Sequence, residues 1–175
     1  MAELRDLFDR SHNSLGKTIE AGRPIPDGCY INVVLIFIQN SRGEFLIQRR
    51  AKSTAFGGMY ATTGGHPKSG ETSREGAATE IAEELGLKIN PQDLQLVCSR
   101  RVDEDQVFSE VYYLKLDVDL DSLRLQPEEV ASVHWFTTAR IYEENANGHF
   151  MPPHFEEFTN ASHYGIFDSI DISQQ

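Results

Sequence analysis

The stretch from Thr72 to Gly86 constrains the fold of this chain more than any other. Thr72 and Glu75 stand three residues apart, the spacing of a capping box at the start of a helix. Gly86 suits the left-handed conformation that ends many helices. Between them, apolar side chains recur at helical spacing, at Ala77, Ala78, Ile81, Ala82 and Leu85. The pattern predicts a helix at about residues 73–85.

Three glutamates crowd one side of that helix. Glu80, Glu83 and Glu84 fall at i, i+3 and i+4, with Glu71 a short distance upstream. Like charges at this spacing cost a helix roughly 0.2–0.5 kcal/mol per pair. A solvated acidic face is the simplest interpretation of such a charge run. The alternative is a cation site, since Mg²⁺ and Mn²⁺ prefer carboxylate oxygens and would turn the repulsion into coordination.

The spacing of the flanking residues favours the cation site. Gly65 is followed after five residues by Glu71, and after seven more by the run Thr79-Glu80-Ile81-x-Glu83-Glu84-x-Gly86-Leu87. This resembles the signature of the Nudix hydrolases in every defined position except Thr79, where the signature has arginine. The resemblance implies an α/β/α sandwich with a mixed β-sheet and the Nudix loop and helix. The strand order resembles that of the family from about residue 28 to 145.

The resemblance also implies roles for individual residues. We expect Mg²⁺ or Mn²⁺ as the cofactor and Glu80, Glu83 and Glu110 as catalytic groups, with Glu110 on a later strand. The expected metal ligands are Glu71, Glu80, Glu83 and Glu84, although Glu71 could instead brace the loop. The expected substrate-binding residues are Arg49, Arg50, Lys52, Gly65 and His66, with Arg50 the first choice for a diphosphate.

Thr79 is the position where the resemblance breaks. In the family the arginine pairs with a helix glutamate and holds it in its catalytic pose. Thr79 offers one hydroxyl and no charge, so Glu80 loses a partner that would keep it ionised and oriented. Arg74 lies five residues earlier and not on the same helix face, which makes it a poor substitute. We therefore expect slower catalysis or a base from elsewhere.

A second resemblance bears on the substrate. The stretch "LIQRRAKSTAFGGMYATTGGHP" and the opening "FDRSHNSLGKTIEAG" are similar to type I isopentenyl-diphosphate isomerases, which share the Nudix fold. The catalytic cysteine of those enzymes corresponds to Gly64 here, and their second strand acid corresponds to Phe108. We therefore expect a hydrolase that cleaves the diphosphate linkage of a nucleoside diphosphate derivative or a related small diphosphate. An isomerase-like enzyme and a non-catalytic nucleotide-binding module are the alternatives.

The remaining patterns predict one domain over residues 1–175. A hairpin-like extension occupies 1–27, with two short strands within 7–22, and a helical tail occupies 150–175, with its helix at 151–167. Alternating or continuous apolar runs predict strands at 29–40, 44–50, 94–103, 107–118 and 128–136, with a short helix at 137–145.

Composition narrows the partners. The 27 acidic and 16 basic side chains give a net charge of −11, which argues against a nucleic-acid or anionic-membrane surface. The longest apolar run, "VVLIFI", is too short to cross a bilayer. Cys29 and Cys98 are expected to be free thiols in a reducing cytoplasm, and no signal peptide is evident. We expect a small-molecule diphosphate as the partner and leave a homodimer open.

Overall fold

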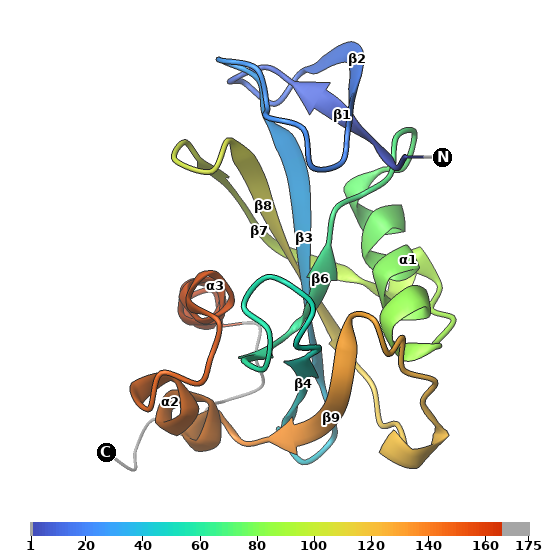
Figure 1. Cartoon of the computed structure of the whole chain (residues 1–175). Helices are drawn as coiled ribbons and strands as arrows, with labels where there is room; N and C mark the ends of the chain where they lie inside the picture. Colours follow the sequence, from blue (N-terminus) through green and yellow to red (C-terminus); the bar gives the residue numbers. More distant parts are fainter. Residues whose placement is uncertain (1, 166–175) are drawn as a thin grey trace.

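A mixed β-sheet of seven strands forms the centre of the molecule in the computed structural model, which describes residues 2–165 (Figure 1). Its strands are β3 (Ile31–Gln39), β4 (Phe45–Arg50), β5 (Tyr60–Ala61), β6 (Thr63–Gly65), β7 (Gln95–Val102), β8 (Val107–Lys115) and β9 (Val130–Phe136). The helices are α1 (Ser73–Leu85), α2 (Thr138–Ala146) and α3 (Pro152–Ser162), with short 3-10 turns at Pro91–Asp93 and Leu120–Ser122. A separate hairpin of β1 (Leu4–Phe8) and β2 (Ser14–Glu20) precedes the sheet.

Strand β3 organises the sheet. It runs parallel to β8 along its full length, from the pair Ile31–Val107 to the pair Gln39–Lys115. On its other side it pairs with β6 in the middle, and it meets β4 only at its end. The short strand β6 therefore lies where β3 and β4 diverge, and it places Gly64 and Gly65 next to α1 (Figure 1).

The alternation of side chains along β3 divides the core into two layers. Val34, Ile36 and Ile38 face α1, where they pack with Ile81 and Leu85. The second layer lies between the other face of the sheet and helices α2 and α3. It includes Phe37, Phe45, Ile141, Phe150 and Phe158. Helices thus cover both faces of the sheet, which confirms the predicted sandwich with its mixed sheet.

The predicted caps of α1 are both present. Thr72 accepts from the backbone N–H of Glu75, and the Glu75 side chain accepts from the backbone of Thr72. Gly86 has φ of 70° in the left-handed region, and its N–H donates to the carbonyl of Ala82. The helix therefore begins and ends where its sequence predicts.

The ends of the chain differ most from the sequence prediction. Strand β1 begins at Leu4 rather than Leu7, because Leu4, Arg5 and Asp6 already pair with Glu20, Ile19 and Thr18 of β2. The predicted helix at 151–167 is observed as Pro152–Ser162, and the part of the predicted tail at 166–175 lies outside the described residues. Cys29 and Cys98 are free, as predicted. Among residues 2–165, no helix is both long enough and apolar enough to cross a membrane.

Candidate active site

Helix α1 directs Glu80 and Glu84 toward the sheet. Glu84 is only 3% exposed, and Glu80 is partly buried, with its carboxyl group beside Gly65 of β6. A Cβ atom on Gly65 would lie 2.2 Å from Oε1 of Glu80, so only glycine at this position lets the carboxyl group rest on the strand. Gly65 therefore shapes the site by lacking a side chain.

Burial changes the acidity of both carboxyl groups. Desolvation, and then the charge of Glu83, raise the pKa of Glu80 to about 7, and the backbone N–H of His66 opposes the shift. Desolvation and then the charge of Glu80 raise the pKa of Glu84 to about 8, against hydrogen bonds from Gln48 and from the Gly64 backbone, the latter 3.4 Å long. Two oxygen-donor groups that share one buried space and repel each other fit a hard divalent cation.

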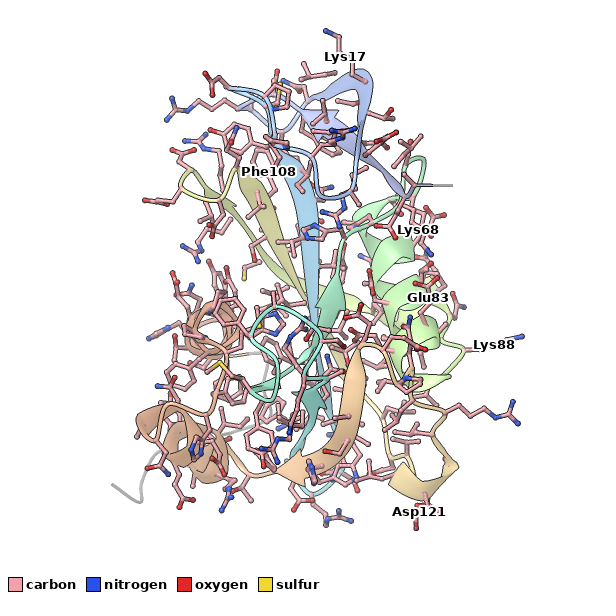
Figure 2. All side chains as sticks on the ribbon, viewed as in Figure 1. Lys17, Lys68, Glu83, Lys88, Phe108 and Asp121 are labelled. Atoms are coloured by element: carbon pink, nitrogen blue, oxygen red, sulfur yellow. The ribbon has the colours of Figure 1, made fainter. Side chains whose placement is uncertain are left out.

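The side chain of Glu83 points toward solvent and Lys68, unlike those of Glu80 and Glu84. It is 45% exposed on its side chain and forms an ion pair with the ammonium of Lys68, and both residues are labelled on the α1 flank in Figure 2. Within residues 2–165, no three His, Cys, Asp or Glu side chains already surround a common point that could hold a metal ion. Ligation by all of Glu71, Glu80, Glu83 and Glu84 stays a prediction, and for Glu83 it requires that Lys68 be displaced.

Glu71 braces the loop that precedes α1. Its Oε2 accepts a hydrogen bond from the backbone N–H of Lys68 at 2.9 Å, and its Oε1 accepts from the hydroxyl of Thr79 at 2.7 Å. Both carboxylate oxygens thus have partners inside the protein. Of the two roles expected for Glu71, this geometry favours the brace.

Arg74 does not replace the missing arginine. Its guanidinium donates to the carbonyl of Leu94 and lies over the ring of Tyr112, 5.7 Å from the centroid. It therefore contacts the β7–β8 side of the helix, in agreement with the sequence argument that it occupies a different face.

Three basic residues were expected to bind substrate, and Arg50 is the one that the structure places near the carboxyl group of Glu84. Its positive charge opposes the rise in the pKa of Glu84. Its Nε donates a hydrogen bond to the Ala55 carbonyl at 2.8 Å. Arg49 instead donates to the Gly58 carbonyl at 3.0 Å and lies over the Tyr60 ring. Lys52 is exposed in the following loop. Arg50 remains the first choice for a substrate phosphate.

His66 is held in one orientation. Its Nδ1 is 2.9 Å from the carbonyl oxygen of Asn32, and because a carbonyl can only accept, Nδ1 carries the proton. Burial, and then the charge of Arg5, lower the pKa of His66 below its usual value. The ring is therefore neutral at pH 7, with Nε2 free to accept a hydrogen bond or a metal ion.

Glu110 occupies a different part of the same sheet face. It is 7% exposed on β8, where Oε1 accepts from the Ser99 hydroxyl at 3.2 Å and Oε2 has no hydrogen-bond partner among the described residues. The main charged neighbours of Glu80 and Glu84 are each other, Glu83, Glu3, Lys68 and Arg50, and Glu110 is not one of them. Its role as a base stays a prediction.

Gln48 and Lys68 belong to the site but were missed in the sequence. Gln48 is fully buried in β4, donates to the Thr62 carbonyl at 3.3 Å and bonds to Glu84. The sequence signal for Gln48 was a polar residue directly after the apolar run Phe45-Leu46-Ile47 of a strand. The sequence signal for Lys68 was its position just after the Gly-His-Pro stretch.

Comparisons with known proteins show the family to which this fold and motif belong. The NUDIX domain family model matches residues 30–158. An uncharacterised Nudix hydrolase of Listeria innocua is 32% identical over 152 residues, covering 86% of this chain and 89% of the relative. An isopentenyl-diphosphate Delta-isomerase of Streptomyces coelicolor is 30% identical over 156 residues, covering 85% of this chain and 78% of the relative. A crystal structure from Deinococcus radiodurans superimposes with a TM-score of 0.70 at 25% identity, covering 85% of this chain and 91% of that one. The chain belongs to the Nudix family.

Proposed function

We propose that this chain is a Mg²⁺- or Mn²⁺-dependent pyrophosphohydrolase that cleaves a diphosphate linkage in a nucleoside diphosphate derivative or a related small diphosphate. The observation that carries the proposal is the pair of the partly buried Glu80 and the buried Glu84 on one helix face, both with raised pKa values. Two neighbouring carboxyl groups with raised pKa values are unfavourable in a protein core when they have only a structural role. Binding of a divalent cation would explain why both are present.

A bound divalent ion would neutralise charge on the phosphate oxygens and make a water molecule nucleophilic. Glu80 and Glu84 would hold it, and Gln48 and the Gly64 backbone would keep the Glu84 carboxylate in place. Arg50, beside Glu84, would bind a substrate phosphate. If Glu83 turns to the ion, Lys68 is released from its ion pair and can contact the same phosphate.

The isomerase alternative has the support of relatives that are 27–30% identical to this chain. Two features of the structure oppose it. A Cβ atom on Gly64, where the resemblance puts the isomerase cysteine, would lie 2.4 Å from the Val34 carbonyl oxygen. Phe108, where it puts the second acid, is buried and stacked on the His12 ring. Neither position can transfer a proton.

The binding-module alternative draws on Thr79. Loss of the arginine weakens a catalytic site, whereas a module that only binds a nucleotide has no need of it. The retained carboxylates at 71, 80, 83 and 84 oppose this alternative, because pure ligand binding gives no reason to keep all four at the spacing of the motif.

A substrate screen tests the proposal. Formation of the phosphomonoester products is measured over a panel of nucleoside diphosphate derivatives and isoprenoid diphosphates with Mg²⁺, with Mn²⁺ and with a chelator, as the phosphate that an added phosphatase then liberates from those products. We expect turnover of at least one diphosphate that the chelator abolishes and that Glu84→Gln lacks. Tight binding of a nucleotide without any turnover would support the binding module instead. A homodimer and a cytoplasmic location remain part of this proposal.

A further inference from the structure

The N-terminal hairpin lies outside residues 30–158, which match the family model, yet it is hydrogen-bonded to the loop that leads into α1. The Leu4 carbonyl accepts from the backbone N–H of Ser69 at 2.7 Å. Oδ1 of Asp6 accepts from the Ser69 hydroxyl at 2.7 Å, and Oδ2 accepts from the Gly70 backbone N–H at 3.0 Å. Figure 1 shows the start of β1 beside this loop. Three hydrogen bonds thus fix the Ser69–Gly70 turn to β1.

This turn lies between two residues that set the positions of the acidic side chains. Lys68, just before it, pairs with Glu83. Glu71, just after it, accepts from the Lys68 backbone and from the Thr79 hydroxyl. The turn is therefore flanked directly by two contacts of the loop with α1, Lys68–Glu83 and Glu71–Thr79.

The hairpin also supports the other end of the loop. Nε2 of His12 is 2.8 Å from Oδ1 of Asn32, and the Asn32 carbonyl accepts from Nδ1 of His66. The His12 ring stacks on Phe108 with 3.7 Å between centroids, and Figure 2 labels Phe108 where β8 approaches the hairpin. Both His66 and the Ser69–Gly70 turn are thus attached, directly or through one residue, to the hairpin.

We propose that Asp6 is a positioning residue of the metal site, which it serves by holding the Ser69–Gly70 turn. The turn in turn keeps the Glu71 brace on Thr79 and the Lys68 partner of Glu83 in place beside the helix that carries the proposed ligands. The metal role rests on the proposed function. Asp6 acts through the loop, as outer partners of metal ligands do, and loss of such partners typically costs about 10–100-fold in metal affinity or activity. The carboxylate accepts one charge-assisted hydrogen bond through each oxygen. An asparagine amide keeps a single acceptor, so its bond with the Ser69 hydroxyl has to reverse and both bonds become the weaker neutral kind.

Asp9 supplies a matched control within the same hairpin. Its Oδ1 accepts from the backbone N–H groups of Ser11 and Asn13, at 2.8 and 2.9 Å, and the hydrogen bonds of its side chain stay within the turn between β1 and β2. Asp9→Asn therefore makes the same chemical change as Asp6→Asn without touching the loop.

The first measurement is Mn²⁺ binding by calorimetry, without substrate. We expect Asp6→Asn and Asp6→Ala to raise the dissociation constant about tenfold, and Asp9→Asn to leave it within about twofold of the wild-type value. The second measurement is amide hydrogen exchange without metal, in which residues 66–71 should exchange faster in the Asp6 variants only.

Two results would overturn the assignment of Asp6. One is an Asp6→Ala protein with wild-type Mn²⁺ affinity and wild-type exchange at residues 66–71. The other is an Asp9→Asn protein that matches Asp6→Asn in both measurements, because the effect would then belong to the hairpin as a whole. A wild-type chain that binds Mn²⁺ but cleaves no diphosphate contradicts the proposed function alone, since neither measurement uses substrate.

Discussion

The hydroxyl of Thr79 donates a 2.7 Å hydrogen bond to Oε1 of Glu71. The sequence led us to expect that Thr79 leaves Glu80 without the partner that the arginine of the family provides; the structure shows that Thr79 instead bonds to the loop glutamate. An open groove of about 590 Å³ runs beside this contact, lined by Gly70, Glu71, Glu75, Ala78, Thr79, Ala82, Lys88, Ile89 and Pro91. The side chain at position 79 therefore has room to grow.

We expect Thr79→Arg to fill this groove and form an ion pair with Glu71. A hydrogen bond to a charged group is worth about 1.5–3 kcal/mol, and about 1.4 kcal/mol corresponds to a tenfold rate change. Hydrolysis should therefore rise about tenfold or more, mostly in kcat, because a firmer loop positions the catalytic groups without adding substrate contacts. Steady-state kinetics on one diphosphate substrate measures this.

Thr79→Val is the control for that substitution, since it removes the hydroxyl at nearly constant volume and should lower kcat. If Thr79→Arg changes nothing or reduces turnover, the site is built around another base, and Glu110→Gln should then show a large loss of kcat. Absence of turnover in the wild type and in both variants would favour the binding module.

Glu84→Gln should separate function from folding. We expect metal-dependent turnover to fall at least about 100-fold, because loss of a direct ligand should exceed the 10–100-fold cost of losing an outer partner. The Tm of the metal-free protein should stay equal or rise, since the amide removes a buried carboxyl group that repels Glu80. Glu104→Gln, at an exposed turn residue, should change neither quantity. Wild-type turnover of Glu84→Gln at limiting Mg²⁺ would contradict the assignment.

The stability of the metal-free protein should fall as pH rises. The pKa values of Glu80 and Glu84 are raised from 4.5 to about 7 and about 8, so between pH 4.5 and 8 the folded state holds more protons than the unfolded state. Their contribution is fully present below pH 4.5 and is lost as pH rises through the folded pKa values. Burial lowers the pKa of His154 from 6.5 to about 3, which acts in the opposite direction below pH 6.5, so the test belongs above that pH.

Thermal melts between about pH 6.5 and 8.5, with a chelator and with Mg²⁺, measure this dependence. The stabilisation by Mg²⁺ should grow with pH, because the ion competes with protons for the same carboxylates. Glu84→Gln should flatten both trends. A Mg²⁺ effect that shrinks as pH rises would show that the ion binds elsewhere.

We expect no isomerase activity on isopentenyl diphosphate. A side chain at position 64 collides with the Val34 backbone, so even Gly64→Cys should fail to create the activity and should lower the stability by about 1–3 kcal/mol through overpacking. Deuterium incorporation into the substrate in heavy water, followed by mass spectrometry, is the measurement. Incorporation at enzyme-like rates by the wild-type chain would reverse the choice between the two reactions.

The sequence alone determined the features that depend on near neighbours. The capping box, the apolar period and the terminal glycine of α1 act over three or four residues, so the bounds of the helix could be predicted closely. Strands β3, β4, β7, β8 and β9 followed from runs of apolar or alternating residues for the same reason. The motif spacing from Gly65 to Leu87 then indicated the family without any knowledge of contacts.

The tertiary structure decided which acidic side chains are buried and what each one contacts. Glu80, Glu83 and Glu84 look alike in sequence, but packing of α1 on β6 and β3 buries Glu84, partly buries Glu80, and leaves Glu83 exposed beside Lys68. Asp6 meets Ser69 across 63 positions of the chain, a contact that no local pattern records. Periodicity specifies which face of an element is apolar, whereas the partner of a polar group depends on how distant segments pack together.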